Sequence, residues 1–215
     1  MEDELLPKPE YEHPTRDVVI ILAVFFEFGL ASLSLILGWL LGRPPLEKFQ
    51  WSSNGAAWGI LATIPLILMF VVMLRWPIGP LARVKEFCDN EVVPLMKGSA
   101  LSDLALISLS TGLGEEMLFR GVIQAAITGW LQSSLGDWWG VPCGIGLASL
   151  IFGICHPFSV PYAVSAAILG VYLGTVWILT GNLLTVMITY ALSDFAALTY
   201  LLRIRPSPGL DDTSK

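Results

Sequence analysis

The sequence predicts an all-α membrane protein, a polytopic bundle of about six to eight transmembrane helices, and three observations lead there. Hydrophobic residues make up 54% of the 215 residues and charged residues only 14%, whereas an average soluble domain has about 25% charged residues. The apolar residues gather in runs of roughly 20, the length at which a helix spans a bilayer. Most ionisable residues lie between these runs rather than inside them.

Six apolar runs are long enough to be spanning helices. They cover residues 18–42, 55–74, 101–131, 140–156, 162–180 and 183–202. The third run is longer than one crossing requires, and Gly112 and Gly114 predict a break in it that would raise the helix count. For the connection 76–99 the sequence leaves two interpretations open, an amphipathic helix at the membrane surface or a solvated loop.

The chain reads as one domain with polar ends. We expect an acidic N-terminal tail over residues 1–17, the helical bundle over 18–203 and a polar C-terminal tail over 204–215. The N-terminal tail lacks the basic start of a signal peptide, so we expect it to be retained. Three cysteines do not make a disulfide framework.

The distribution of positive charge predicts the orientation. Six crossings place both termini on one side, and the side of a membrane that carries more Lys and Arg is the cytoplasmic one. Nine cations fall on the terminal side and two on the other: Lys8, Arg16, Arg75, Arg83, Lys85, Lys97, Arg203, Arg205 and Lys215 against Arg43 and Lys48. We therefore expect a multi-pass protein of the cell membrane with cytoplasmic termini. The net charge of −6 argues against a nucleic-acid partner.

Three ionisable residues stand together inside the third run, in "STGLGEEMLFRGVIQ". Ionisable residues at membrane depth indicate a functional site by default. Glu116 and Arg120 are four residues apart and share a helix face, so Arg120 is expected to neutralise Glu116 as a structural pair. Glu115 points about 100° away, which leaves it to find a proton, a metal or a partner from another helix.

His156 and two residues of the last run are the other candidates. His156 ends the fourth run in "FGICHP", and an imidazole suits general-base work or metal binding. Tyr190 and Asp194 are four residues apart in "TYALSDF" and share a helix face. Each has a structural alternative, as a hydrogen-bonded helix terminus, a packed core residue or part of a buried network. The free Glu115 favours a functional interpretation for His156. Asp194 is a second unpaired intramembrane carboxylate, and its position beneath Tyr190 favours a functional interpretation for Tyr190.

Other polar or small residues in the runs receive structural interpretations. Cys155 precedes His156, but adjacent helical residues point about 100° apart, so a Cys–His nucleophile is not expected. Glu27 is assigned to the membrane boundary. The pair Gly170 and Gly174 has the small-xxx-small spacing that lets helices approach closely.

Two motifs resemble those of a known family. "GEEMLFRG" contains E-E-x-x-x-R, and "FGICH" contains F-x-x-x-H with Phe152 as its first residue. On successive apolar runs and in this order, they resemble the CPBP family, the CAAX-processing and bacteriocin-processing intramembrane proteases to which the Ras-converting endopeptidase belongs. The resemblance covers roughly residues 100–200. It departs at the family's third motif, H-x-x-x-N, where Tyr190 and Asp194 occupy the positions of His and Asn.

The resemblance implies an intramembrane endopeptidase in which Glu115 and His156 activate a water. Tyr190 would then hydrogen-bond the developing oxyanion, and Glu116, Arg120 and Phe152 would support the site. If the site binds Zn²⁺, the protein ligands would be Glu115, His156 and Asp194, the number usual in a catalytic zinc site. The sequence leaves open whether the enzyme is a metalloprotease or a metal-free, glutamate-dependent one.

Two further classes of function stay open. The substitution at Tyr190 favours a catalytically impaired family member that acts as a membrane binding, scaffold or immunity protein. Intramembrane carboxylates and a histidine also suit a proton-coupled transporter, although the internal repeat of many transporters is not visible in the sequence. The expected partners are the lipid bilayer and a membrane protein or peptide substrate, and the sequence does not predict an oligomeric state.

Overall fold

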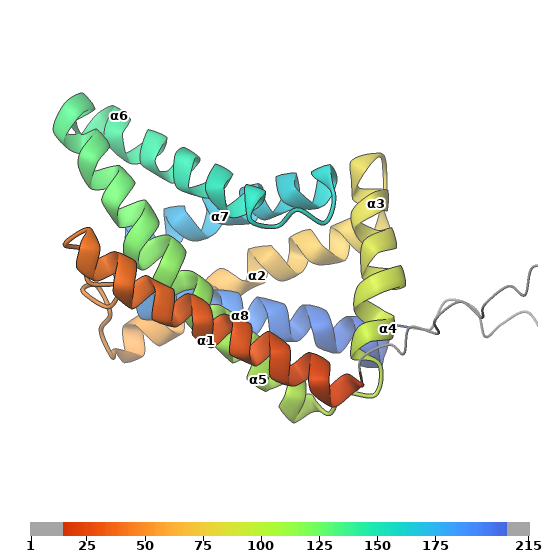
Figure 1. The fold of residues 1–215 in the computed structure, drawn as a ribbon. Coiled ribbons are helices and arrows are strands. Elements are labelled where there is room, and N and C mark those ends of the chain that lie inside the picture. The colour runs from red at the N-terminus through yellow and green to blue at the C-terminus, as the bar shows by residue number, and fades with distance from the viewer. Residues whose placement is uncertain (1–14, 206–215) are drawn as a thin grey trace, which may run out of the picture.

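The structure is a computed structural model that describes residues 15–205, and these residues form helices joined by short turns (Figure 1). The helices are α1 Arg16–Leu40, α2 Ser53–Arg75, α3 Pro80–Phe87, η1 Cys88–Val92, α4 Val93–Met96, α5 Leu101–Glu116, η2 Met117–Gln124, α6 Ala125–Ile154, α7 Val160–Thr180, α8 Leu183–Thr199 and η3 Tyr200–Ile204, where η marks π-helical turns. No strand occurs in this range. Most residues of the two predicted tails, 1–14 and 206–215, lie outside the described residues.

Five helical stretches are long and apolar enough to cross a membrane, and one of them crosses twice. Leu101–Ile154 runs for 54 residues, which at 1.5 Å per residue is more than twice a hydrocarbon core of about 30 Å. It is interrupted at Gly136, whose φ of 72° and ψ of 171° are not helical, and there the chain turns back on itself (Figure 1). The structure thus confirms the predicted all-α membrane bundle, with a crossing number at the lower end of the expected range.

The predicted break near Gly112 and Gly114 is wrong, because α5 is continuous through both glycines. They serve close packing instead. A Cβ on Gly112 would lie 2.7 Å from the carbonyl oxygen of Met187 in α8, and one on Gly114 would lie 2.9 Å from a carboxyl oxygen of Glu27 in α1. The turn falls at Gly136, because a positive φ is accessible to glycine without a steric penalty.

The connection 76–99 is helical rather than a plain loop. Helices α3, η1 and α4 form one continuous rod that begins with Gly79 as its N-cap and Pro80 in its first turn, a position where the missing N–H of proline costs nothing. The rod stands across one end of the bundle, at a steep angle to the spanning helices (Figure 1). It packs on α2 and α7, and its last turn packs on α1.

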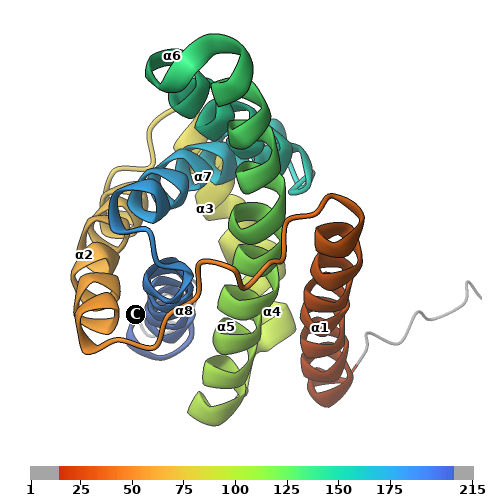
Figure 2. The ribbon, with the colours of Figure 1, turned by 90° about the vertical axis from the view of Figure 1, so that its left-hand side faces the viewer.

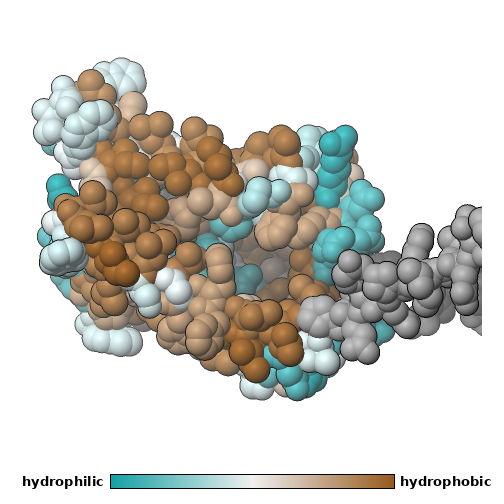
Figure 3. Space-filling model, in the orientation of Figure 1, coloured by the Kyte–Doolittle hydropathy of each residue, from teal (hydrophilic) through white to brown (hydrophobic). Residues whose placement is uncertain are grey.

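Helices α5 and α8 lie at the centre of the bundle (Figure 2). Helix α8 packs on α2 and α5, α1 packs on the outer side of α5, and α6 packs on α7. On the face that Figure 3 shows, the surface over the long helices is largely apolar, and exposed apolar side chains of the bundle include Phe25, Trp39 and Leu179. That pattern suits helices that face lipid. The same view shows a hollow in this surface with hydrophilic residues at its floor.

Candidate active site

The glutamate doublet lies where α5 passes into the wider turn of η2. Glu115 and Glu116 are the last two residues of α5, and both are buried. η2 also contains Arg120 and is almost wholly buried. π-helical turns inside longer helices occur frequently at functional sites. Here the junction of α5 and η2 places Glu115, Glu116 and Arg120 in the buried centre of the bundle.

Glu116 and Arg120 form the buried pair that their spacing predicts. Arg120 Nη1 donates to Glu116 Oε1 at 2.7 Å, and the two side chains are 2% and 0% exposed. Arg120 Nη2 donates to the carbonyl of Gly170 in α7 at 3.2 Å. The guanidinium also lies 4.8 Å from the ring centroid of Phe152, a favourable cation–π distance. This pair therefore joins α5, α6 and α7.

Glu115 faces His156 across a wider gap. Glu115 Oε1 lies 3.6 Å from His156 Nε2, which is too far for a direct hydrogen bond. His156 Nδ1 lies 2.7 Å from the carbonyl oxygen of Phe152. Because a carbonyl oxygen only accepts, Nδ1 carries a proton and Nε2 is the nitrogen directed at Glu115. The other oxygen, Glu115 Oε2, is buried without a partner among the described residues.

Tyr190 joins this group, whereas Asp194 is turned toward α5. Tyr190 is buried, its ring lies 6.3 Å from that of Phe152, and it lines the same cavity as His156. Asp194 Oδ2 accepts a hydrogen bond of 2.7 Å from Ser108 in α5. The four-residue spacing predicted a shared face for Tyr190 and Asp194, and both side chains line the same cavity.

That cavity has a volume of about 230 Å³. His156, Tyr190 and Asp194 form its polar wall, and Tyr162 stacks on the His156 ring at 6.3 Å with an interplanar angle of 30°. Its other walls are mainly apolar and come from α2, the α3–η1 rod, α7 and α8: Leu66, Met69, Phe70, Met73, Val84, Val92, Ala166, Leu169 and Leu198. A pocket of this size and lining can hold water and an apolar side chain beside His156, whereas Glu115 is not among its lining residues and reaches it only through His156.

The predicted zinc ligands do not converge on one point. Among residues 15–205, no three His, Cys, Asp or Glu side chains are close enough together to hold a metal ion. Glu115 and His156 could act as two ligands, but Asp194 is engaged by Ser108. A catalytic zinc site usually needs three protein ligands. The described residues do not fit such a site, and the expected Zn²⁺ stays a prediction.

One buried acid was assigned to the wrong environment from the sequence. Glu27 is not at the membrane boundary but midway along α1, only 8% exposed, with Thr111 Oγ1 donating to its Oε1 at 3.2 Å. The signal that could have located it is its position as the only charged residue in the interior of a 25-residue apolar helix.

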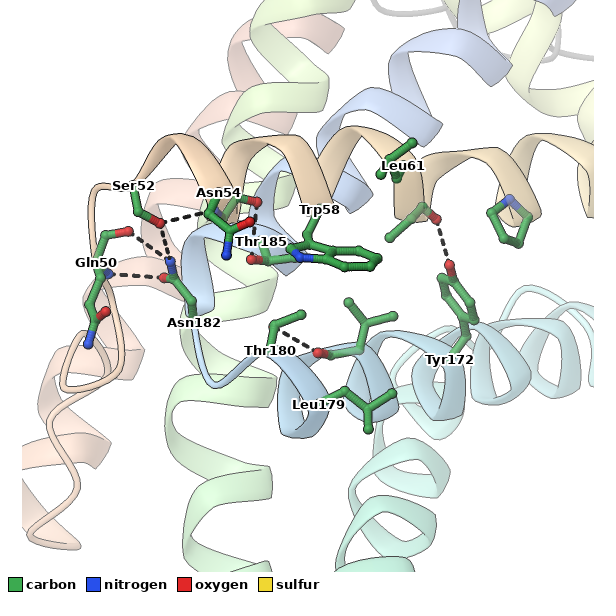
Figure 4. Close-up of a pocket in the computed structure, with 14 residues that line it drawn as sticks. Gln50, Ser52, Asn54, Trp58, Leu61, Tyr172, Leu179, Thr180, Asn182 and Thr185 are labelled. Carbon is green, nitrogen blue, oxygen red and sulfur yellow. Dashed lines mark hydrogen bonds between the residues drawn. The ribbon is translucent and has the colours of Figure 1, made fainter.

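A larger cavity lies elsewhere, at the other end of α2 and α7, with a volume of about 640 Å³ (Figure 4). Asn182 at its polar end is hydrogen-bonded to the backbone of Gln50 and to Ser52. Its lining residues include no Asp, Glu, Lys, Arg or His. Tyr172, the titratable residue in this lining, donates its hydroxyl to the Ala62 carbonyl at 2.6 Å. Because this cavity has no carboxylate, amine or imidazole, we place the candidate active site in the smaller cavity.

Residues 97–196 match a family model, Rce1-like, described as type II CAAX prenyl endopeptidase Rce1-like. The search of curated proteins found no match to the chain, and neither did the search of solved structures. The matched residues contain both glutamates, Arg120, His156 and Tyr190. The match confirms the predicted relation to the CAAX proteases and leaves α1 and α2 outside the matched region.

Proposed function

We propose, given that this chain belongs through residues 97–196 to the Rce1-like family of CAAX proteases, that it is an intramembrane endopeptidase in which Glu115 and His156 activate a water. The observation that carries the proposal is the 3.6 Å gap between Glu115 Oε1 and His156 Nε2 beside a cavity. A water placed there can donate to the carboxylate and to the imidazole nitrogen at once.

The hydrolysis follows from the atoms that face this gap. Glu115 Oε1 accepts a proton from the water while the water oxygen attacks the carbonyl carbon of the substrate, and His156 Nε2 orients the water through its lone pair. The C–N bond then breaks as the proton held by Glu115 passes to the departing amine nitrogen. His156 is held in the required orientation by its contact with the Phe152 carbonyl.

Tyr190 is assigned to the oxyanion of the tetrahedral intermediate. It stands where the family's third motif has histidine, and a phenol O–H can donate to a developing negative charge as an imidazole N–H can. Its burial in the wall of the cavity that His156 also lines supports this role. Ser108 holds Asp194 away from the oxyanion, where a carboxylate would be repulsive.

The substrate is proposed to be a membrane protein or peptide that presents apolar residues to the cavity. The apolar walls from α2, α7 and α8 suit such a segment. We also propose that both termini are cytoplasmic. Three arginines of the predicted cytoplasmic side bind at the rod end of the bundle: Arg16 donates to Gly98, Arg203 to Ser99 and Arg205 to Asp89.

The test is cleavage by variants of the two activating residues. Glu115→Ala and His156→Ala should abolish cleavage of a membrane-tethered peptide while both proteins still accumulate in the membrane. Cys155→Ser is the matched control, because Cys155 is exposed and adjacent to His156 but has no role in the mechanism. Unchanged cleavage in either alanine variant would overturn the proposal.

The departures from the family's third motif favour a second function. Tyr190 and Asp194 in the third motif suit a protein that has lost hydrolysis and uses its polar core to bind a membrane partner. In that case Glu115→Gln would leave the biological effect intact, whereas the endopeptidase requires the carboxylate.

A further inference from the structure

A third carboxyl group approaches the proposed active site from outside the matched region. Glu27 lies midway along α1, which precedes residues 97–196. It belongs to a buried stripe of α1 that includes Ile20, Ser34 and Gly38 and faces α5. A carboxyl group in the middle of a spanning helix is costly unless it is neutral or paired, so its position calls for a partner.

The contacts of Glu27 place it within one helical turn of Glu115. Thr111 Oγ1 donates to Glu27 Oε1 at 3.2 Å. Gly114 leaves room for the carboxyl group, since a Cβ there would lie 2.9 Å from Glu27 Oε2. Thr111 and Glu115 are four residues apart and share one face of α5. The carboxyl group of Glu27 therefore packs against α5 at Thr111 and Gly114, next to Glu115.

The charges of the described interior require Glu27 to be neutral. The bundle interior holds four carboxyl groups, those of Glu27, Glu115, Glu116 and Asp194, but only two side chains that can be cationic, Arg120 and His156. Arg120 is committed to Glu116, and His156 faces Glu115. An ionised carboxylate without a cation is strongly disfavoured at this depth. A protonated Glu27 has an O–H group to donate.

Two orphaned oxygens indicate where that proton points. Glu27 Oε2 and Glu115 Oε2, like Glu116 Oε2, are buried without a hydrogen-bond partner in residues 15–205. Buried polar atoms in native proteins are nearly always hydrogen-bonded. A hydrogen bond between the Glu27 and Glu115 oxygens, direct or through one water, would satisfy both.

We propose that Glu27 is a positioning residue for the endopeptidase reaction: in its neutral form it donates from Oε2 to Glu115 Oε2 and so directs Glu115 Oε1 at the water. The inference rests on the proposed function, because Glu115 Oε1 is the base of that mechanism. It adds a residue from α1 to a site whose other members come from α5, from the turn that follows α6 and from α8.

The activity test separates hydrogen-bond donation from packing. Glu27→Leu removes the donor and should lower kcat about 10- to 100-fold, the range for a lost hydrogen bond to a charged group, with KM unchanged. Glu27→Gln keeps a donor and should restore kcat to within a few-fold of wild type. Ser34→Ala is the control, because Ser34 is equally buried on the same stripe and bonds only within α1. All variants are compared at equal amounts of folded protein.

The results discriminate between the two proposals. Glu115-dependent cleavage that Glu27→Leu does not change, or a Glu27→Gln variant as impaired as Glu27→Leu, would overturn the role of Glu27 alone. Absence of cleavage in the wild type would overturn the endopeptidase instead. An infrared spectrum of the purified protein then still tests the contact. Glu27→Gln should remove one carbonyl-stretch band of a protonated carboxylic acid and Glu115→Gln should shift that band, whereas a spectrum that Glu27→Gln leaves unchanged would contradict a neutral Glu27.

Discussion

Glu115 and Glu116 are neighbours in the chain, but one belongs to a closed contact and the other to an open one. Glu116 Oε1 accepts a hydrogen bond from Arg120 Nη1 at 2.7 Å, and Arg120 Nη2 donates a second one to the carbonyl of Gly170. Glu115 Oε1 stops 3.6 Å short of His156. The second oxygen of each carboxylate has no partner in the described part of the chain, so the difference lies in the first oxygens. The first contact leaves no room for another atom, whereas the second leaves room for a water.

The difference comes from helix geometry. Successive residues point about 100° apart, so Glu116 reaches along its own helix to Arg120 while Glu115 reaches out toward α6 and α8. A carboxylate bound to a fixed cation is a poor base, because the cation stabilises its ionised form. A carboxylate beside an imidazole and a cavity can take a proton from a water. The structural and the catalytic carboxylate are thus separated by one residue.

Breaking the closed pair has the largest expected effect on stability. Arg120→Met leaves Glu116 buried without a cation, so the free energy of unfolding should fall by about 3–5 kcal/mol. The double variant Glu116→Gln/Arg120→Met should recover most of that loss, because no buried charge stays unpaired. Thermal unfolding in detergent measures both. A double variant as unstable as Arg120→Met would show that the pair does more than neutralise charge.

Removing the hydroxyl group of Tyr190 should affect the open contact of Glu115 and His156 and leave the Glu116–Arg120 pair unchanged. Tyr190→Phe should lower kcat about 10²- to 10³-fold, the usual cost of one lost oxyanion donor, while the unfolding temperature stays near wild type. Tyr190→His, which restores the residue expected from the family motif, is the matched comparison because it keeps a donor. Wild-type turnover in Tyr190→Phe would assign the oxyanion to another group.

A smaller effect on stability is expected at Gly112, where α5 packs closely against α8. This packing supports both the closed Glu116–Arg120 pair and the open Glu115–His156 contact. In Gly112→Ala the added Cβ would lie 2.7 Å from the Met187 carbonyl oxygen and 2.9 Å from Ala191 Cβ, and such overpacking costs about 1–3 kcal/mol. Stability and cleavage should fall together, unlike in the two variants above. Gly146→Ala is the control, because nothing lies within 4 Å of the added Cβ. Equal behaviour of the two alanine variants would contradict a packing role for Gly112.

The smallest effect on stability is expected for Asp89, a carboxylate that is also paired with cations but is partly exposed, at the rod end of the bundle. Asp89 accepts from Lys85 at 2.8 Å and from Arg205 Nη2 at 3.0 Å. Partial burial acts to raise the pKa of Asp89, but the hydrogen bonds from Arg205 and Lys85 outweigh it and hold the pKa below its ordinary value. Such partly exposed pairs contribute about 0.2–1 kcal/mol.

The sign of the pH dependence follows from that lowered pKa. The stabilisation is fully present above the unfolded pKa of Asp, about 3.9, and is lost as the pH falls through the folded pKa. Asp89→Asn should therefore lower the unfolding temperature slightly at neutral pH and have no effect in strong acid. Glu86→Gln, on an exposed neighbour, should have no effect at either pH. A deficit of Asp89→Asn that persists in strong acid would contradict the ion pair as its cause.

The sequence was sufficient to predict the spanning helices and the Glu116–Arg120 pair. Runs of apolar residues set the ends of the spanning helices to within a few residues, and the reversal at Gly136 falls between the predicted runs 101–131 and 140–156. The spacing of Glu116 and Arg120 predicted their contact, because residues four apart on a helix are neighbours. Both signals are local, and neither depends on how the helices pack against each other.

What the sequence did not predict depends on packing between helices. Gly112 and Gly114 resemble helix breakers, yet they are contact points for α8 and α1, which only the three-dimensional arrangement reveals. Glu27 was assigned to the boundary because a single charge in an apolar run does not say which face of α1 is buried. The turn of Asp194 toward Ser108 in α5 likewise needs the partner helix to be in place.

The most direct test of the central claim is whether the purified protein, in liposomes, cuts a library of membrane-anchored peptides, read by mass spectrometry for new termini. We expect cuts with wild type that fall about 10²- to 10⁴-fold with Glu115→Gln, the range for loss of a general base. A Glu115→Gln variant that cuts as fast as wild type, or a wild type that cuts no peptide, would contradict the account.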